Sequence, residues 1–319
     1  MLSSAITVQD VTVRLTIRTA IWRSQVARIA NAVDGLVPVV KGNGYGFGRN
    51  WLASIAAEFC DTVAVGTVHE LDGLPDELTP IVLTPTLTAP TSTKPILTVG
   101  ADEHLAALAG WNGRVVVKLA SPMRRFGRDP ALIDRALACG LDVVGVSIHP
   151  PLAGTRAEHG AAITTLLPAI DPAIPVWASH LDITTYAQLP ATHSYRLRMG
   201  TMLWHGDKQA LHLSADVIDV HPVDAGDNAG YRMGAVGGNG HLVMVGAGTA
   251  NGVTAIDQGE LSSLSPFHFE RTRLALHEAP HMHTTMTFVP DGSPTPAIGD
   301  RVDLQRPLNM TAVDEYEWL

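Results

Sequence analysis

Eight short apolar runs recur across the first two-thirds of the chain, and segments with helical periodicity separate most of them. Runs of this kind are typical of strands that are buried on both faces, as in a parallel sheet. Because parallel strands alternate with helices, eight such units predict a (β/α)8 barrel. The expected strands are residues 37–40, 62–66, 80–84, 95–99, 114–118, 142–149, 174–178 and 194–198.

The pattern changes after about Lys208. Helical periodicity disappears, and valine alternation with glycine-rich turns dominates residues 212–223, 231–256, 281–290 and 297–304. Residues 11–17 alternate in the same way near the start of the chain. Such alternation predicts strands with one buried face. We therefore expect two domains: a barrel over residues 18–207, and a mainly β domain made of residues 1–17 and 208–319.

The composition is that of a globular and acidic chain. Its 319 residues are 46% hydrophobic and carry a net charge of −9, which disfavours nucleic acid and anionic membranes as partners. Residues 1–10 lack a signal-peptide pattern, and no apolar run reaches the roughly 20 residues that span a bilayer. The only two cysteines, Cys60 and Cys139, fit a reducing compartment. We expect a cytoplasmic protein.

The end of the first apolar run carries the strongest chemical signal. Lys41 follows this run directly, and four glycines lie between positions 42 and 48. Desolvation at the end of a buried strand lowers the pKa of a lysine, which suits it to covalent bonding with carbonyl groups and to proton abstraction. Glycines allow sharp turns and close approach of the backbone to a ligand. A surface lysine followed by a glycine-rich turn is the non-catalytic interpretation.

Four further strand ends carry polar residues. The active site of a (β/α)8 barrel lies at the carboxyl ends of its strands. Lys118 and Arg125 follow the fifth run, His149 ends the sixth, and Ser179 and Arg198 lie at the ends of the seventh and eighth. Each has an ordinary alternative, such as a solvated arginine or a histidine that fills a loop. Their recurrence at successive strand ends favours a shared site.

The stretch VVKGNGYGFG, residues 39–48, resembles the lysine motif of the alanine racemase family, which are fold-type III enzymes that depend on pyridoxal 5′-phosphate (PLP). The resemblance implies the same architecture, a TIM barrel followed by a β domain. It implies that Lys41 holds PLP covalently and that Tyr45 helps to hold the phosphate of the cofactor.

Two further barrel segments resemble the same family. KLASPMRRFG, residues 118–127, is similar to K-x-D-T-G-M-x-R-x-G, which implies that Arg125 positions the cofactor and the substrate carboxylate with support from Lys118. GVSIH, residues 145–149, resembles G-x-x-x-H and implies that His149 lies beside the PLP ring.

Two more segments would complete the cofactor site. RMGT, residues 198–201, resembles R-x-G-I, so that Arg198 would face the pyridine nitrogen while Gly200 and Thr201 bind phosphate through the backbone. Ser179 would stand in for the phosphate-binding serine of the family. Since an arginine keeps its proton, a pyridine nitrogen facing Arg198 stays largely unprotonated, which favours racemisation over transamination.

Racemisation requires a base on each face of the substrate α-carbon. Ala229-Gly230-Tyr231 resembles the family motif x-G-Y-G, whose tyrosine is the second base and comes from the partner subunit of a homodimer. The resemblance therefore pairs Lys41 with Tyr231 as catalytic residues. It also places Met282 beside Arg125 among the substrate-binding residues. A tyrosine base needs a cationic neighbour, for which His149 and Arg198 are candidates.

Three departures from the family pattern leave alternatives open. His283 replaces an aspartate after Met282, the seventh strand reads A-S-H-L-D instead of A-N-S-A, and no counterpart of a C-terminal phosphate-binding tyrosine follows Val313-Asp314-Glu315. The first interpretation is interconversion of L- and D-alanine with PLP and no metal. The second is another fold-type III enzyme that acts on D-amino acids, of dehydratase or aldolase type, with a metal at His281 and His283. The third is a non-catalytic PLP-binding protein.

Overall fold

The computed structural model describes residues 13–257 and 263–319, and the predicted absence of a signal peptide in residues 1–10 falls outside them. The chain divides into two compact units, one made of Met1–Trp22 with Asp207–Leu319 and the other of Arg23–Gly206. We call the first the β unit and the second the barrel unit. Each is described by itself.

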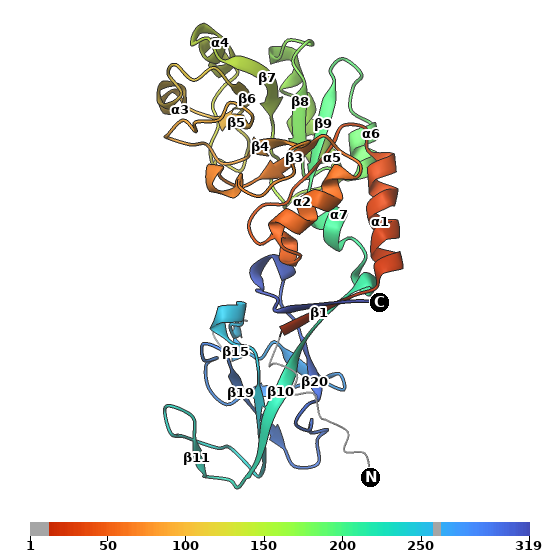
Figure 1. Cartoon of the computed structure of the whole chain (residues 1–319), viewed down its shortest axis with the longest axis vertical. Coiled ribbons are helices and arrows are strands. Elements are labelled where there is room, and N and C mark those ends of the chain that lie inside the picture. The colour runs from red at the N-terminus through yellow and green to blue at the C-terminus, as the bar shows by residue number, and fades with distance from the viewer. Residues whose placement is uncertain (1–12, 258–262) are drawn as a thin grey trace. The chain divides into compact units, whose positions relative to one another are not determined.

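The barrel unit contains the eight predicted parallel strands, in the order β2-β9-β8-β7-β6-β5-β4-β3 (Figure 1). A parallel bridge between Val39 and Ala64, just beyond β2, joins the two ends of this sheet, and Val40 N–H donates to Ala64 at 2.8 Å. The sheet is therefore closed, and the predicted (β/α)8 barrel is confirmed. The strands are β2 (Leu36–Pro38), β3 (Thr62–Val65), β4 (Thr79–Val82), β5 (Ile96–Val99), β6 (Arg114–Lys118), β7 (Asp142–Ser147), β8 (Val176–Ser179) and β9 (Tyr195–Met199).

Apolar side chains fill the inside of this barrel. One buried cluster takes residues from most of the strands, as expected for a closed sheet whose interior is packed rather than open. Trp177 is the largest member, and Gly145 makes room for it, since a Cβ at Gly145 would overlap the Trp177 indole. The buried members are Val37, Val39, Ala64, Ile81, Ile96, Val116 and Trp177.

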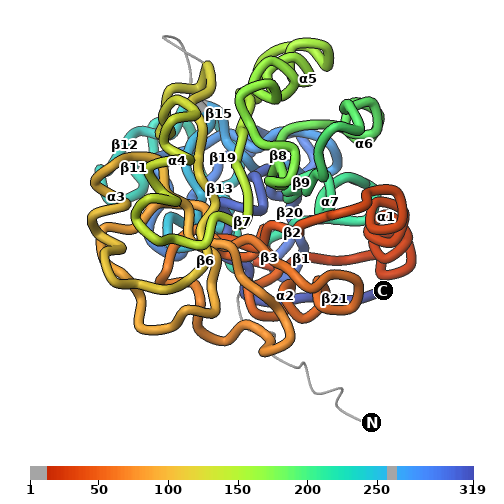
Figure 2. The backbone as a smooth tube through the Cα atoms, turned by 90° about the horizontal axis from the view of Figure 1, so that it is seen from above, coloured from red at the N-terminus to blue at the C-terminus, as the bar shows by residue number. Residues whose placement is uncertain are grey.

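Helices lie around the outside of the barrel strands, as Figure 2 shows for α4, α5 and α6. Among the described residues, the connection from β3 to β4 forms the 3-10 turn η2 (Val68–Glu70) and no α-helix, and the connection from β4 to β5 contains neither. A short helix after β9 was not predicted from the sequence. The α-helices are α1 (Thr19–Ala32), α2 (Arg49–Ala57), α3 (Asp102–Ala107), α4 (Ala131–Ala138), α5 (Arg156–Thr164), α6 (Ile183–Ala187) and α7 (Thr201–His205).

The β unit contains a nine-stranded sheet around the long strand β10 (Leu211–Val223). The first half of β10 pairs antiparallel with β1 (Val13–Ile17), and the second half pairs with β13 (Gly240–Val245). One strand therefore spans both parts of the sheet, which confirms the predicted β domain. The other members are β16 (Phe267–Phe269), β17 (Thr272–Arg273), β18 (Ala275–Leu276), β19 (Thr285–Pro290), β20 (Arg301–Leu304) and β21 (Glu315–Trp318).

Two small strand pairs lie outside this sheet. They are β11 (Asn228–Ala229) with β12 (Gly234–Ala235), and β14 (Ile256–Asp257) with β15 (Ser263–Leu264). The turn between β11 and β12 carries Tyr231, and its Gly230 and Met233 have positive φ angles of 78° and 49°.

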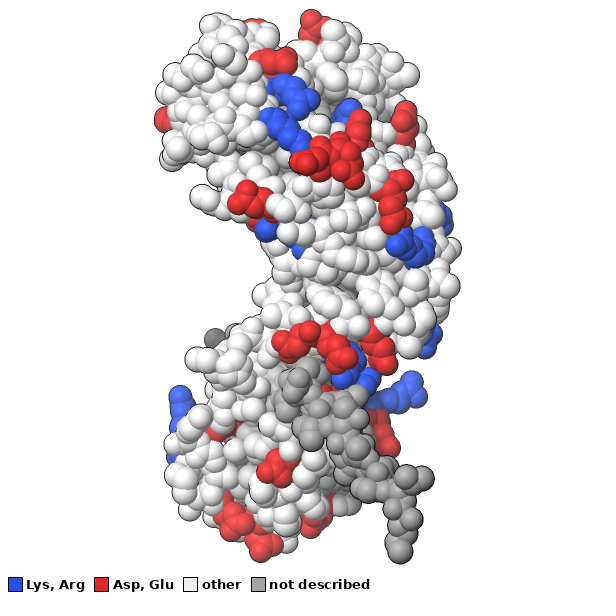
Figure 3. All heavy atoms as spheres, viewed as in Figure 1, with Lys and Arg blue, Asp and Glu red and all other residues white. Residues whose placement is uncertain are grey.

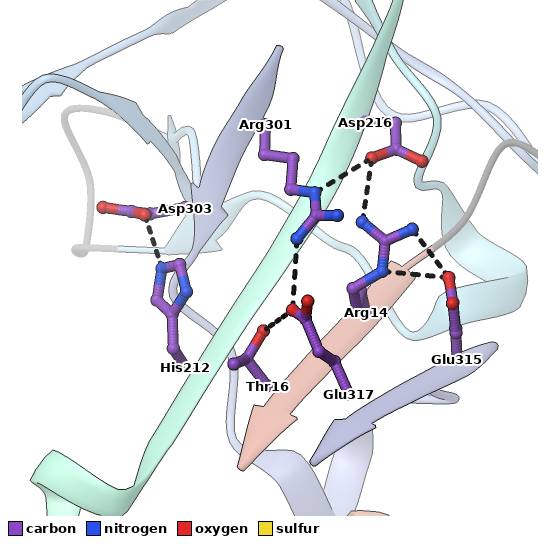
Figure 4. Close-up of polar contacts among 8 residues, drawn as sticks. All are labelled: Arg14, Thr16, His212, Asp216, Arg301, Asp303, Glu315 and Glu317. Carbon is purple, nitrogen blue, oxygen red and sulfur yellow. Dashed lines mark hydrogen bonds and ion pairs between the residues drawn. The ribbon is translucent and has the colours of Figure 1, made fainter. Parts of the chain in front are cut away.

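A buried arginine joins the two ends of the described β unit (Figure 4). Arg14 on β1 is 2% exposed; its Nη2 lies 2.6 Å from Glu315 on β21 and its Nη1 lies 3.6 Å from Asp216 on β10. Arg301 contacts Asp216 at 3.9 Å and Glu317 at 3.3 Å. These ion pairs join strands that are remote in sequence, and they hold the parallel strand β21 beside β1.

Charged residues of both signs are distributed over the face drawn in Figure 3, and the lysines and arginines described there do not gather into one patch. Within the described parts of the chain, no helix is long and apolar enough to cross a membrane.

Removal of Arg14 should destabilise the protein far more than removal of the Glu315 charge. Arg14→Leu removes the buried guanidinium beside the Asp216 carboxylate, which is 12% exposed, and breaking a buried pair from one side costs about 3 kcal/mol. Glu315 is 51% exposed, so Glu315→Gln should cost less than about 1 kcal/mol. Urea unfolding followed by circular dichroism measures both, and equal losses would contradict this account of the network.

Candidate active site

A cavity of about 630 Å³ lies at the carboxyl ends of the barrel strands. Four cationic residues line it, and none of the described residues in its wall is acidic. An enclosed basic cavity favours an anionic ligand. The predicted barrel residues that line it are Lys41, Tyr45, Lys118, Arg125, His149, Ser179, Arg198, Gly200 and Thr201. The structure thus brings together residues that are widely separated along the chain, from Lys41 to Thr201.

The glycine-rich segment after β2 forms a tight loop that presents Lys41 and Tyr45 to the cavity. Gly44 has φ +64°, and a Cβ there would lie 2.4 Å from the backbone nitrogen of Arg49. The loop can therefore fold against α2 only with glycine at this position. Glu70, which sequence reasoning missed, accepts from Gly42 N–H at 3.2 Å and from Gly66 N–H at 2.7 Å, and so ties the loop to the end of β3.

Both cavity lysines lose proton affinity. Desolvation lowers the pKa of Lys41, Arg125 and Arg198 lower it further, and Glu70 opposes them. Desolvation, with Arg198 and Arg125, lowers the pKa of the buried Lys118 to about 7. The Lys118 Nζ lies 3.5 Å from the carbonyl oxygen of Ser147. A lysine with a lowered pKa is a better nucleophile and base near neutral pH, as the sequence position of Lys41 predicts.

Arg198 is held rigidly by carbonyl groups at the ends of β7 and β8. Its Nη2 donates to Ile148 and Trp177 at 3.2 Å, and its Nε donates to Ala178 at 3.4 Å. These bonds do not use Nη1. Burial, with nearby Arg125, lowers the pKa of Arg198 to about 10, so the guanidinium is still charged at neutral pH. The result is a fixed cation in the wall of the cavity.

His149 is a neutral side chain in this site. Burial lowers its pKa to about 2, and Arg198 and His180 contribute to the shift. Its Nδ1 is hydrogen-bonded to the Ser179 hydroxyl, which also accepts from Arg198 Nη2 at 3.4 Å. The ring of His180 lies 4.3 Å from the ring of His149. Because His149 stays uncharged, it is not available as the cationic neighbour that a tyrosine base needs.

Tyr45 and Gly200 meet in the wall of the cavity. A Cβ at Gly200 would lie 2.1 Å from the Tyr45 hydroxyl oxygen, so the phenol can approach this backbone only because position 200 is glycine. Burial raises the pKa of Tyr45 to about 12, which keeps the hydroxyl protonated as a hydrogen-bond donor. Gly200 precedes Thr201, the first residue of α7, and His205 of this helix contacts the Tyr45 carbonyl at 2.7 Å.

The other two predicted site residues, Tyr231 and Met282, belong to the β unit, and their place at the barrel cavity stays a prediction. Their side chains are 84% and 66% exposed. The ring of Tyr231 lies 4.3 Å from the ring of His281. The Nε2 of His281 contacts Glu278 at 2.6 Å, and the described residues contain no group of three or more potential metal ligands.

Sequence reasoning missed several residues of the cavity wall. Several lie at predicted strand ends, as Val39, Gly66 and Thr84 do, but their side chains carry no charge that would mark them as site residues. His180 follows Ser179 at the end of the seventh predicted strand, but it was given no role in the site. The missed members of the wall are Val39, Gly66, Leu83, Thr84, Phe126, Leu152, His159, His180, Leu181, Met199, Met202, His205 and Gly206.

Comparison with known proteins gives one family and one fold. Residues 17–207 match the profile of the alanine racemase N-terminal domain. A search of curated protein sequences gives no match. The crystal structure of alanine racemase from Bartonella henselae with covalently bound pyridoxal phosphate aligns with 97% of this chain and 99% of its own, at 16% identity and a TM-score of 0.72.

Two other solved structures align over similar lengths. Alanine racemase from Clostridium difficile 630 covers 97% of each chain at 17% identity, with a TM-score of 0.67. The biosynthetic alanine racemase from Pseudomonas aeruginosa covers 97% of this chain and 99% of its own at 18% identity, also with a TM-score of 0.67. At sequence identities of 16–18%, these alignments show that the chain shares the fold of the three enzymes.

Lys118→Met should stabilise the cofactor-free protein at pH 7, and this gain should shrink towards pH 10. The pKa of Lys118 is about 7 when folded against an ordinary 10.5, so between these values the unfolded chain binds more protons and the wild type gains stability as pH rises. The variant lacks this pH dependence. Its free energy of unfolding at pH 7 should therefore exceed that of the wild type by roughly a few kcal/mol.

Thermal unfolding of the wild type and Lys118→Met at several pH values between 7 and 10 measures this gain. Lys94→Met provides the control, because Lys94 is a half-exposed lysine paired with Asp76 at 3.7 Å. A stability difference for Lys118→Met that stays constant over this range would contradict the lowered pKa.

Proposed function

The chain belongs to the alanine racemase family, since the family profile covers residues 17–207, and from this premise we propose that it is a PLP-dependent amino-acid racemase that interconverts L- and D-alanine. One observation carries the proposal. Lys41, whose pKa is lowered, lies in a closed-barrel cavity whose charged residues are all cationic. A lowered pKa makes the lysine able to form a covalent bond with an aldehyde. The positive charge of the cavity suits a ligand that carries a phosphate and a carboxylate.

The residues of the cavity fit PLP. Lys41 would carry the cofactor, while the protonated hydroxyl of Tyr45 and the backbone at Gly200 and Thr201 would receive its phosphate. The close contact of Tyr45 with Gly200 supports this role, because a Cβ at position 200 would displace the phenol. Ser179 would take part through its hydroxyl.

Arg198 favours racemisation over other PLP chemistry. When bound, PLP supplies an electron sink that makes the α-proton of an amino acid removable. A charged Arg198 next to the pyridine nitrogen would keep that nitrogen unprotonated and so limit how long negative charge resides on the ring. Its pKa of about 10 and its bonds to three strand-end carbonyls support a fixed charge at neutral pH. The neutral His149 would lie beside the ring without adding charge.

Proton transfer would use one base on each face of the substrate. Lys41 would move the α-proton on one face, and Tyr231 of the partner subunit would move it on the other. Arg125 would bind the substrate carboxylate, and Met282 would be a further substrate-binding residue. Arg125 supports this role because it lines the cavity and lowers the pKa of both lysines there. A homodimer that shares its active sites is part of this proposal, because the family resemblance brings the tyrosine from the partner subunit.

The protein incubated with PLP should racemise alanine, and Lys41 should be the residue that holds the cofactor. Borohydride reduction followed by peptide mapping should label the peptide containing Lys41. Chiral chromatography after incubation with L-alanine and a panel of other L-amino acids should detect the D-enantiomer. Lys41→Ala should remove both the label and the activity, whereas Lys94→Ala should retain both. Labelling at another lysine would overturn the assignment, and PLP binding without any racemisation would favour a non-catalytic PLP-binding protein.

A mixture of two inactive variants should recover activity if the tyrosine comes from the partner subunit. In a mixed dimer of Lys41→Ala and Tyr231→Phe, one site receives an intact lysine and an intact tyrosine, and the other receives neither. Random reassociation of a two-fold dimer then gives roughly a quarter of the wild-type rate. The control is the double variant Lys41→Ala with Tyr231→Phe, taken through the same reassociation. It should stay inactive, because none of its sites contains the lysine or the tyrosine. A mixture that forms mixed dimers yet stays as inactive as its components would show that the tyrosine acts within its own chain.

A further inference from the structure

A partly buried acid–histidine pair lies directly against Tyr231 in the β unit. The Nε2 of His281 contacts the Glu278 carboxylate at 2.6 Å, and the two side chains are only 20% and 11% exposed. The same carboxylate accepts a hydrogen bond from Tyr231 N–H at 3.1 Å. The rings of Tyr231 and His281 lie 4.3 Å apart with an angle of 48° between their planes. Glu278 thus contacts the backbone of Tyr231, and His281 contacts its side chain.

Gly230 makes this approach possible. It has φ +78°, and a Cβ at this position would lie 2.4 Å from one carboxylate oxygen of Glu278 and 2.6 Å from the other. Any other residue would push the carboxylate away from the Tyr231 N–H group. The positive φ and the close contact both require glycine here.

The pair is attached to a fixed part of the β unit. The His281 carbonyl accepts from Thr249 N–H at 2.8 Å, and His281 N–H donates to Thr284 at 2.8 Å. Gly248 packs against this backbone so closely that a Cβ would lie 2.4 Å from the His281 carbonyl oxygen. The position of the His281 ring is therefore set by the turn at residues 281–284 and not by a free loop.

The Glu278 carboxylate stays ionised in this setting. Burial alone would raise its pKa, but the hydrogen bonds from Tyr231 N–H and His281 outweigh burial and lower the pKa below its ordinary value. An ionised acceptor makes a stronger hydrogen bond to a backbone N–H than a neutral one does. Glu278 is therefore a suitable anchor for the turn that carries Tyr231.

We propose that Glu278 and His281 are positioning residues that fix the turn and ring of Tyr231 for proton transfer. This inference rests on the proposed function. The Tyr231 side chain is 84% exposed in the β unit, so few other contacts of its own unit restrain it. A misplacement of about 1 Å can cost about 10²-fold in rate, which explains why a base on the short turn between β11 and β12 needs such support.

The first experiment detects the contact without cofactor or activity. The chain has five tyrosines, so a carbon–proton correlation spectrum of protein with ¹³C-labelled tyrosine rings contains few signals. Tyr231→Phe identifies the signal of Tyr231 by its loss. His281→Ala should shift this signal because the neighbouring ring is removed, and His281→Phe should restore part of the shift. The matched control is His212→Ala, because His212 contacts Asp303 at 2.7 Å but is 58% exposed.

The second experiment separates the two faces of the substrate. With PLP-loaded protein in deuterium oxide, α-proton exchange is measured for each enantiomer of alanine. Tyr231→Phe identifies the enantiomer that depends on the tyrosine. Glu278→Ala and His281→Ala should slow exchange of that enantiomer by about 10²-fold and leave the other, which Lys41 serves, nearly unchanged. Glu278→Gln, which keeps an acceptor for Tyr231 N–H, and His281→Phe should recover part of the loss.

The outcomes distinguish failure of this inference from failure of the proposed function. An unshifted Tyr231 signal in His281→Ala, or equal slowing of both enantiomers, would overturn the positioning role even if the protein racemises alanine. If the wild type exchanges neither enantiomer, the proposed function fails, and a shifted Tyr231 signal then still establishes the contact but not its role in proton transfer.

Discussion

The closed barrel confines four cations in one cavity, and the chemistry of the site depends on that confinement. The bridge between Val39 and Ala64 joins the sheet ends, so Lys41, Lys118 and Arg198 converge although they are widely separated along the chain. Charges that are close together in a medium of low dielectric constant repel strongly. Desolvation is the larger cause of the lowered pKa values of both lysines and of Arg198, and repulsion among these cations lowers the values further.

This concentration of positive charge links ligand binding to stability. Cationic groups that are desolvated and lie close to one another destabilise the empty barrel. An anion bound in the cavity offsets the repulsion among them. A ligand that binds only the folded state adds stability in proportion to the logarithm of its concentration over its dissociation constant. The same charges that lower the pKa of Lys41 would therefore also bind the phosphate of the cofactor. Ligand binding would thus add to the stability that packing gives the site.

Sequence reasoning found the parts of this structure that repeat or that end a buried strand. Most of the barrel strands were predictable because they are short apolar runs, and Lys41 and Arg198 were predictable because they lie at the ends of expected strands. The helix Thr201–His205 is too short to show periodicity. Glu70 follows no apolar pattern that would connect it to Gly42, and Glu278 lies 47 residues from Tyr231, so only the folded chain shows these contacts.

The charges of the cavity limit which cation could lower the pKa of a tyrosine base in the proposed mechanism. A phenol gives up its proton near neutral pH only next to positive charge, because its reference pKa is about 10. His149 is excluded as that charge, since burial and Arg198 keep it neutral. Of the two candidates named from the sequence, Arg198 remains, charged and fixed by three carbonyl groups. In the β unit, the carboxylate of Glu278 is directed to a backbone N–H and to His281, so its negative charge is already engaged there. In the proposed mechanism the barrel would thus supply the positive charge, while Glu278 and His281 would position the ring of Tyr231.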